Sequence, residues 1–192
     1  IAYWVSDRVK EIFEKSEKLG DVGDPRLGMS TNDNGRFLRN WVEIDYTNIE
    51  YSITNIANVI SSPKKWFPYN KGGEYRRWFG NFENVINWEN NGYEVKEYAT
   101  YLYKSYTRTV KNIPYFFKEA LTWSLISSSK FGARLMPHGF IIGDAGPTCY
   151  PHSSIKLELL AFMNTKICKW MLDIMNPTLN FSPGVLKNIP FD

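Results

Sequence analysis

Residues 64–92, KKWFPYNKGGEYRRWFGNFENVINWENNG, combine cations, large aromatic side chains and amides around a Gly-Gly pair. The first half of this stretch carries five Lys and Arg residues against one acid, Glu74. Residues 66–69 and 85–88 are rich in aromatic and β-branched side chains, which predicts two short strands. Gly72-Gly73 predicts a turn at which the backbone can approach a partner closely. We expect the rest of the fold to hold this stretch in place.

The composition of residues 64–92 suits nucleic acid. Lys and Arg neutralise phosphates and release counterions, Arg and Asn side chains can read base edges, and aromatic faces stack on exposed bases. The alternative is structural: the aromatic residues form ordinary core, and the cations form its solvated rim with their stems lying on apolar surface. Both interpretations stay open at this point.

Length and charge set bounds on the fold and on the partner. The chain has 192 residues, of which 43% are hydrophobic, enough for one cored domain or a domain with an appendage. A net charge of +3 is too small to identify a nucleic-acid-binding protein by itself. The positive charge is concentrated in residues 61–134, so we expect one basic central face.

Cysteine and histidine usage argues against a metal site. Cys149 and Cys168 lie far apart without metal-ligand spacing, and His138 and His152 are the chain's only histidines. No signal peptide and no long uninterrupted apolar run is present, which predicts a cytoplasmic protein without membrane partners. The chain begins at Ile1 rather than Met, and we interpret it as a piece of a longer protein.

The N-terminal third predicts a helix, a turn, a polar loop and a strand. Apolar residues recur at helical spacing over residues 6–20, with Ser as a cap and Gly as a stop. Residues 20–25 have turn composition. Residues 31–35 form a polar loop that could contact phosphates or bases or could be a plain Asx-type turn, and a strand is expected over residues 37–44.

The remaining elements complete a mixed α and β prediction. A helix begins at Tyr93, presents Lys96 and Lys104 to solvent and ends near Lys104. Strands are expected over residues 122–127 and 140–142. The last helix runs from a cap at Ser153 or Ser154 to Asn176-Pro177, and the tail after it returns to turn and strand composition. Its expected core stripe consists of Leu160, Met163, Ile167, Met171 and Ile174.

The chain resembles the C-terminal region of the PglX group, the adenine-specific DNA methyltransferases of BREX phage-defence systems, and more broadly type IIG restriction enzymes. Four stretches carry this resemblance: GMSTNDNGRFLRNW at 28–41, PYNKGGEYRRWFGNFENVINWENNG at 68–92, TWSLISSSKFGARLMPHGFIIGDAGPTCYP at 122–151, and LLAFMNTKICKWMLDIMNPTLNFSPGVLKNIPF at 159–191.

The resemblance implies a target-recognition domain that clamps double-stranded DNA, similar to the specificity domains of type I restriction systems. The implied reaction of the whole protein is methyl transfer from S-adenosylmethionine to the exocyclic amine of a flipped adenine, carried out in a separate catalytic domain. We therefore expect no cofactor and no catalysis in this chain. The string nearest to the family's catalytic motif, Asn176-Pro177-Thr178-Leu179, lacks the second Pro and the aromatic residue.

On this interpretation, the fold is α+β, an irregular short-stranded sheet with packing helices. Residues 1–20 form a spacer helix towards the catalytic part, and residues 21–192 form the recognition domain. Double-stranded DNA is the expected partner, and other defence-system proteins are further candidate partners. For each candidate contact residue a structural role is the alternative. The candidate DNA-binding residues are Asn32, Asn34, Arg36, Asn70, Lys71, Arg76, Arg77, Trp78, Lys130, Arg134 and Asn180.

Two rival functions remain. The first is a carbohydrate-active domain with Glu89 and Asp144 as a carboxylate pair, although nothing in the sequence fixes their separation. The second is a protein-interaction scaffold within a defence complex.

Gly143 and Gly146 resemble half of a nucleotide-binding loop but lack the full spacing and the following helix.

Overall fold

The computed structural model describes residues 4–127, 130–152 and 154–191. Within these residues the strands form two four-stranded sheets, which we call the upper sheet and the central sheet. The upper sheet has the order β2 (Leu38–Asn40), β4 (Asn84–Asn87), β3 (Trp66–Asn70), β7 (Ile141–Ile142). The central sheet has the order β1 (Gly23–Arg26), β8 (Thr148–Pro151), β5 (Ala120–Thr122), β6 (Arg134–Met136).

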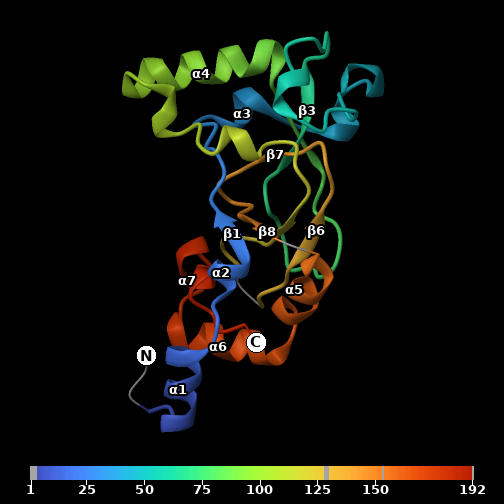
Figure 1. Ribbon diagram of the computed structural model, residues 1–192. Helices are drawn as coiled ribbons and strands as arrows, with labels where there is room; N and C mark the ends of the chain where they lie inside the picture. Colours follow the sequence, from blue (N-terminus) through green and yellow to red (C-terminus); the bar gives the residue numbers. More distant parts are fainter. Residues whose placement is uncertain (1–3, 128–129, 153, 192) are drawn as a thin grey trace.

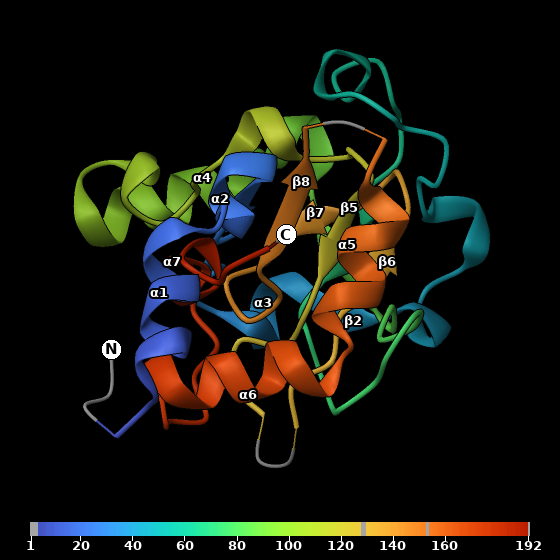
Figure 2. The same ribbon diagram turned by 60° about the horizontal axis from the view of Figure 1, so that its bottom comes forward.

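Helices pack at the two ends of the molecule (Figure 1). The upper end carries α3 (Asn34–Phe37) and α4 (Glu89–Tyr103). The lower end, which comes forward in Figure 2, carries the helical layer: α1 (Asp7–Lys15), α2 (Leu19–Val22), α5 (Lys156–Met163), α6 (Lys166–Met175) and α7 (Pro183–Lys187). Short 3-10 helices span Trp41–Glu43, Tyr46–Asn48, Ile56–Asn58, Tyr106–Arg108 and Ile113–Tyr115. The predicted α+β class is confirmed.

The central sheet lies between two hydrophobic cores. Successive strand residues point to opposite faces, and the neighbours Ala120 and Leu121 of β5 accordingly enter different cores. Ala120 joins the upper core, which includes Phe67 and Trp88, and Leu121 joins the lower core between the central sheet and the helical layer. Because one sheet contributes to both cores, the two ends of the molecule are parts of one packed body.

The hairpin at the centre of the upper sheet is the stretch quoted above. β3 and β4 pair antiparallel with Phe67 opposite Ile86, and both side chains are fully buried. β7 joins β3 in parallel, with Asn70 opposite Ile142. The strands expected over residues 66–69 and 140–142 are confirmed, and the one expected at 85–88 begins a residue earlier, at Asn84, and ends at Asn87.

The N-terminal helix is confirmed but ends at Lys15 rather than Gly20. Its buried Phe13 enters the lower core, so α1 packs on this domain. The expected turn at residues 20–25 is wrong, because α2 ends at Val22 and the next residues pair with β8 as β1. Pro25 is tolerated there because β1 is an edge strand.

Two further strands are shorter than expected. The strand expected over residues 37–44 is limited to β2, because Asp33 caps α3 by accepting a 2.9 Å hydrogen bond from the Arg36 amide, and a 3-10 helix follows β2 at Trp41. The strand expected over residues 122–127 ends at Thr122. Of the polar loop expected over residues 31–35, residues 31–33 are loop, and Asn34 and Gly35 belong to α3.

The helix expected from Tyr93 is confirmed, and Lys104 ends it in the left-handed conformation. Gly92 has a φ of +70°, and a Cβ there would lie 2.6 Å from the Trp88 ring, so this tight entry into the helix requires glycine. Lys96 was expected in solvent but is partly buried, with its Nζ 5.3 Å from the Trp88 ring centroid. Burial lowers the pKa of Lys96.

The expected last helix is two helices, α5 and α6, separated at Asn164. The Asn164 side chain bonds the Ala133 backbone in both directions, accepting from N at 3.1 Å and donating to O at 3.0 Å. Thr165 then caps α6 by accepting a 3.0 Å bond from the Cys168 amide. The break turns Ile167 into solvent, with 59% of its surface exposed, so its expected core position is wrong.

Of the other predictions for this region, some are confirmed and some are wrong. Leu160, Met163 and Met171 are buried as expected, and α6 ends at Asn176 as expected. Ser154 does not cap α5, whose N-cap is Ile155, and Ser153 lies outside the described residues. The tail begins with the expected turn at residues 176–180. It then forms α7, and isolated bridges at Asn180 and Pro190 stand in place of the expected strand.

Candidate nucleic-acid interface

The loop between β3 and β4, residues 71–83, joins the upper sheet to the central sheet. We call it the hairpin loop. The Trp78 amide donates a 2.9 Å hydrogen bond to Ala133 O, and the Leu135 amide donates a 2.8 Å bond to Trp78 O. Because β6 is the edge strand of the central sheet, these bonds fasten the loop along an otherwise open edge. The hairpin loop, with its basic and aromatic residues, is therefore attached to the upper sheet through β3 and β4 and to the central sheet through β6.

Internal contacts fix the shape of the hairpin loop. Gly72 has a φ of +82°, and a Cβ there would overlap Ala145 O, so the close backbone approach predicted at Gly72-Gly73 is made to the protein itself. Asn81 closes the loop by donating a 2.8 Å hydrogen bond to Glu74 O. These contacts give the loop a defined conformation, which fixes the positions from which its exposed side chains project.

Arg134 supports this loop from beneath and does not reach the surface. It is 1% exposed, and its guanidinium lies 3.4 Å from Arg76 O and 3.5 Å from Ser124 Oγ. Burial, with a smaller contribution from Arg76, lowers the pKa of Arg134 to about 10, so the side chain stays charged at neutral pH. The prediction that Arg134 contacts DNA is corrected accordingly: its contacts are with the underside of the loop.

Asn70 is also internal. It is fully buried, and its amide donates hydrogen bonds to Thr122 Oγ1 at 2.7 Å and to Gly146 O at 2.9 Å. These bonds join the end of β3 to the central sheet and to the loop after β7. The prediction that Asn70 contacts DNA is corrected for the same reason, since DNA cannot reach a side chain in this position.

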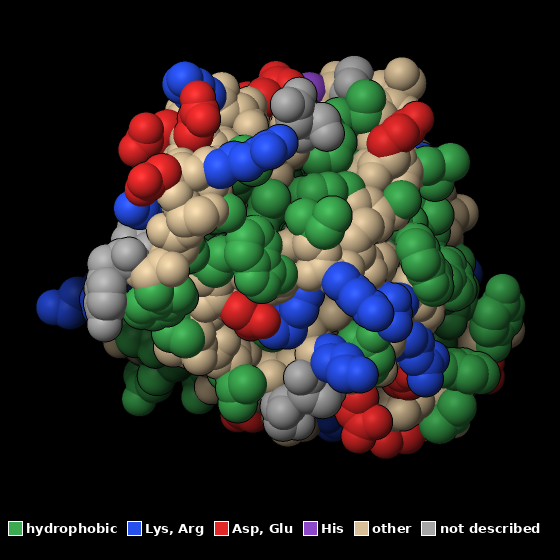
Figure 3. Space-filling model, turned by 90° about the horizontal axis from the view of Figure 1, so that it is seen from below, with side chains coloured by type: hydrophobic (Ala, Val, Ile, Leu, Met, Phe, Trp, Pro, Cys, Tyr) green, Lys and Arg blue, Asp and Glu red, His purple; other side chains and the backbone are tan. Residues whose placement is uncertain are grey.

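A groove of about 500 Å³ opens below the hairpin loop, between that loop, the segment before β6 and the start of α6. We call it the basic groove. Figure 3 shows Lys and Arg side chains gathered on this face beside hydrophobic side chains. Its lining residues are Tyr75, Arg77, Lys130, Phe131, Asn164, Thr165, Lys166, Lys169, Trp170 and Asp173.

Four of these residues are cations, and one is an acid. Lys169 forms an ion pair with Asp173 on the next turn of α6. Arg77, Lys130 and Lys166 have no acidic partner within 4 Å among the described residues. The groove therefore presents positive charge that its own surroundings do not neutralise.

Aromatic and polar contacts orient this charge. The Arg77 guanidinium lies 5.8 Å from the Tyr75 ring centroid and donates a 3.5 Å hydrogen bond to Asn164 O. Trp170 is 48% exposed beside the cations. Cations that neutralise phosphates next to aromatic faces are a typical surface for a nucleic-acid backbone.

The structure brings five of the predicted residues to this region. Arg76, Arg77 and Trp78 lie on the hairpin loop, and Lys130 lines the basic groove. Asn180 is exposed on a segment that pairs with Ile126, close along the chain to Lys130.

Sequence reasoning missed Lys166, Lys169 and Trp170. Their spacing of three and four residues places them on one face of α6, a pattern that was present in the sequence beside the apolar stripe.

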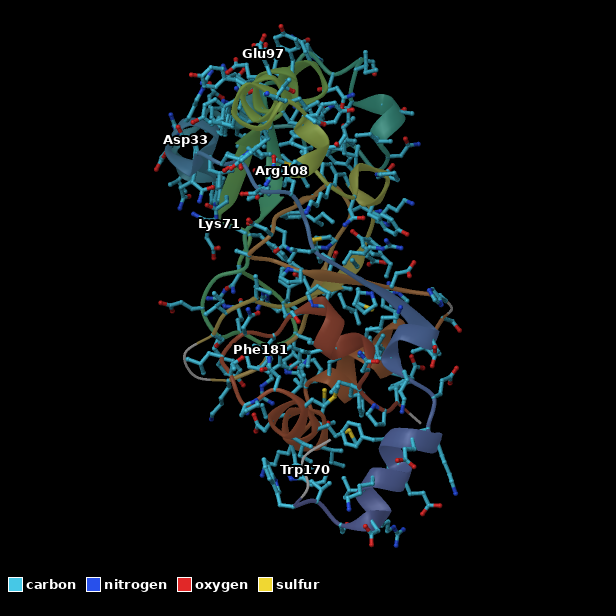
Figure 4. The ribbon with its side chains drawn as sticks, turned by 90° about the vertical axis from the view of Figure 1, so that its left-hand side faces the viewer. Asp33, Lys71, Glu97, Arg108, Trp170 and Phe181 are labelled. Carbon is cyan, nitrogen blue, oxygen red and sulfur yellow. The ribbon has the colours of Figure 1, made fainter. Side chains whose placement is uncertain are left out.

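A second group of predicted residues lies at the upper end. Asn34 and Lys71 line a shallow hollow of about 450 Å³ together with Arg39. Figure 4 shows Asp33 and Lys71 on one side of the upper end, and the chain after Lys71 descends on that same side. This hollow and the basic groove thus lie along one flank, connected by the hairpin loop.

The other two upper residues have internal contacts. Asn32 donates a 3.1 Å hydrogen bond to Thr109 Oγ1 and adopts a φ of +62°, which favours the structural alternative for this residue. Arg36 is exposed, with its guanidinium 5.1 Å from the Tyr98 ring centroid.

Comparison with known proteins gives the family context. No protein-family model matches the chain. The adenine-specific methyltransferase PglX of Lacticaseibacillus casei (strain Zhang) is 36% identical over 99% of this chain, and the adenine-specific methyltransferase BrxX of Escherichia coli O9:H4 (strain HS) is 34% identical over 99%. The chain matches a segment of these methyltransferases. It spans 16% and 15% of their lengths, and the similarity confirms the resemblance to the PglX group.

In this PglX-related segment, the two glycines after β7 pack closely against β3. A Cβ on Gly143 would lie 2.6 Å from the Tyr69 hydroxyl, and one on Gly146 would lie 2.7 Å from Asn70 O. The Cβ side of both glycines is therefore filled by β3, and glycine is required at both positions for this close packing.

The string Asn176-Pro177-Thr178-Leu179 has a structural role. Asn176 ends α6, donates a 2.6 Å hydrogen bond to Asn180 O and accepts a 2.8 Å bond from the Thr178 hydroxyl. Glu89 and Asp144, the carboxylate pair of the carbohydrate-active alternative, have different partners. Glu89 lies 3.9 Å from Lys65 Nζ, and Asp144 accepts a hydrogen bond from the Ala145 amide.

The described residues contain no cluster of His, Cys, Asp and Glu suited to a metal ion. Cys149 and Cys168 are both buried and unpaired, and burial raises the pKa of each thiol to about 12. Among the described helices, none combines the length and apolar character that crossing a membrane requires.

Proposed function

We propose that this chain is a double-stranded DNA-binding module, the target-recognition part of an adenine-specific methyltransferase. The observation that carries this proposal is the basic groove below the hairpin loop, where Arg77, Lys130 and Lys166 are cationic without acidic partners among the described residues. Contacts to phosphates from such a surface position a protein on DNA. The relatives named above supply the reaction class.

In the proposed division of labour, this segment binds DNA and another part of the protein performs methyl transfer with S-adenosylmethionine. The packing around Gly143 and Gly146 supports the absence of a donor site at that loop. The helix-ending role of Asn176 supports the view that this string is not a catalytic loop. Bases would be read from the flank that joins the basic groove to Asn34 and Lys71.

The test is selection of bound duplexes from a random-sequence pool, followed by affinity measurement on the enriched sequence at two salt concentrations. We expect enrichment of a short motif and an affinity that falls with salt. The charge-reversal variant Arg76→Glu/Arg77→Glu should lose binding while keeping its circular dichroism spectrum. Absence of binding by both this chain and the longer protein that contains it would refute the proposal.

A protein-interaction role is a second candidate, favoured by a separate surface. The segment after β2 exposes Trp41, Val42, Tyr46 and Tyr51, and the two tyrosine rings stack with centroids 5.3 Å apart. An exposed apolar group of this kind marks contact surfaces for other proteins. Pull-down of other defence proteins that is abolished by Trp41→Ser/Val42→Ser, with DNA binding intact, would support this role.

A further inference from the structure

Trp78 occupies an unusual backbone conformation at an exposed position. Its φ is +75°, a value that bulky L-residues adopt only rarely because Cβ crowds the backbone. Its side chain is 53% exposed, so burial of the indole does not compensate for this strain. Two hydrogen bonds to the β6 segment, through Ala133 and Leu135, hold the residue there. Strain that is maintained by surrounding structure and presents a side chain outward is a sign of function.

The neighbours of Trp78 make the tip of the hairpin loop rigid. Phe79 packs edge-on against Phe82 with ring centroids 5.1 Å apart, and Phe82 packs on Phe140 of the upper core at 4.7 Å. Trp78 itself has no ring partner among the described residues. The tip thus stands on an aromatic support and projects one indole that contacts no other ring.

Cations directly precede the projecting indole. The stem of Arg76 lies across Gly80, where a Cβ would be 2.5 Å from Arg76 Cδ, and Gly80 has a φ of +119°. This glycine therefore leaves room for the arginine at the loop tip. Arg77 points into the basic groove on the adjoining side. The indole can contact the apolar base stack, and the guanidinium groups of the two preceding residues can contact phosphates. This arrangement suits a duplex, in which the base stack lies between two phosphate backbones.

We propose that Trp78 inserts into the base stack of bound DNA as a wedge, while Arg76 and Arg77 hold the flanking phosphates. This inference rests on the proposed DNA-binding function. Apolar wedges that enter between base steps unstack and kink a duplex. In a protein that acts on a flipped adenine, a wedge would fill the space that the base leaves. The strained, rigid backbone holds the indole ready for insertion before DNA arrives.

The probe is a pair of otherwise identical duplexes, one intact and one with a central abasic site. A wedge enters an abasic site without first unstacking a base, and it can find that site in any sequence context. The chain should therefore bind the abasic duplex about tenfold more tightly than the intact one. The difference between the two affinities isolates insertion from phosphate contact, which both duplexes share.

Trp78→Gly is the decisive variant, because glycine adopts a φ of +75° without strain and keeps the loop conformation while removing the ring. It should melt no lower than the wild type, bind the intact duplex with the same salt dependence, and lose the preference for the abasic duplex. Trp41→Ala is the matched control, since Trp41 is also an exposed tryptophan (45%) but lies on the segment after β2. This control should keep the preference.

The outcomes separate the two proposals. If neither this chain nor the longer protein that contains it binds the intact or the abasic duplex, the DNA-binding function and the wedge are both overturned. Salt-dependent binding of both duplexes with equal affinity, or an abasic preference that survives in Trp78→Gly, would overturn the wedge and leave the DNA-binding function standing.

Discussion

Neutralising two cations of the basic groove should change the salt dependence of DNA binding by a calculable amount. Arg77, Lys130 and Lys166 have no acidic partner within 4 Å among the described residues, whereas Lys169 is paired with Asp173. Three phosphate contacts give a slope of about −2.7 for log affinity against log salt, at about −0.9 per contact. This predicts roughly a 40-fold loss of affinity between about 50 and 200 mM salt.

The double variant Arg77→Gln/Lys166→Gln removes two of the three contacts. Its slope should fall to about −0.9, so that the same increase in salt costs only about 3.5-fold in affinity. If other parts of the flank contribute further phosphate contacts, both slopes become steeper, and their difference stays at about 1.8. The difference is therefore the quantity to compare.

Fluorescence anisotropy of a labelled duplex over a salt series measures both slopes. The matched control is Lys10→Gln/Lys15→Gln on α1, which removes the same charge from a helix outside the basic groove. The control should keep the wild-type slope. Equal slopes for the groove variant and the control, in folded proteins, would refute the assignment of these cations to phosphate contact.

Three further outcomes test the internal residues. Asn70→Ala should lower the free energy of unfolding in urea by about 1–3 kcal/mol, because the buried groups that Asn70 bonds lose their partner; unchanged stability with a weaker affinity for the duplex would mean that Asn70 touches DNA after all. Burial alone would raise the pKa of Glu50, but hydrogen bonds from Ser52 and Ser62 outweigh it and lower that pKa below its ordinary 4.5. The resulting stability is complete above pH 4.5 and is lost as the pH falls through the folded value, so Glu50→Gln should be less stable than the wild type at pH 7 and nearly equal to it at low pH; a constant difference in thermal melts would contradict this. The two cysteines, whose thiol pKa values burial raises to about 12, should not react with an aromatic disulfide reagent at pH 8 until denaturant is added, and rapid reaction of the native protein would contradict their burial.

The local elements were predictable where one physical signal dominated. The strand Trp66–Asn70 follows from its aromatic composition. Gly72, two residues after the strand, predicts a close backbone approach, but the sequence does not say which part of the molecule the backbone approaches. The end of α4 at Lys104 and of α6 at Asn176 follow from local sequence. In these cases the residues that decide the structure are close together in the chain.

Long-range contacts explain what sequence reasoning missed. Asn164 breaks the last helix because it bonds Ala133, some thirty residues earlier, and no local pattern discloses that bond. The same separation hid the burial of Arg134 beneath the loop that carries Arg76. Because Arg134 is a basic residue in a basic segment, the sequence suggested that it contacts DNA at the surface. The hairpin loop passes over Arg134 and buries it.

The candidate interface depends both on local sequence signals and on long-range packing. Arg77 and Lys130 were identifiable from the charge of the central segment, but their meeting with Lys166 depends on the packing of α6 against the segment before β6. The spacing of Lys166, Lys169 and Trp170 indicated an exposed helical face without saying what it faces.

The most direct test of the central claim is lysine acylation footprinting by mass spectrometry, with and without a saturating duplex. Bound DNA should slow acylation of Lys130 and Lys166 severalfold and leave the rates at Lys10 and Lys15 on α1 unchanged. Uniform rates at all four positions under conditions where the duplex is bound, or protection confined to α1, would contradict the claim that the basic groove is the surface that holds DNA.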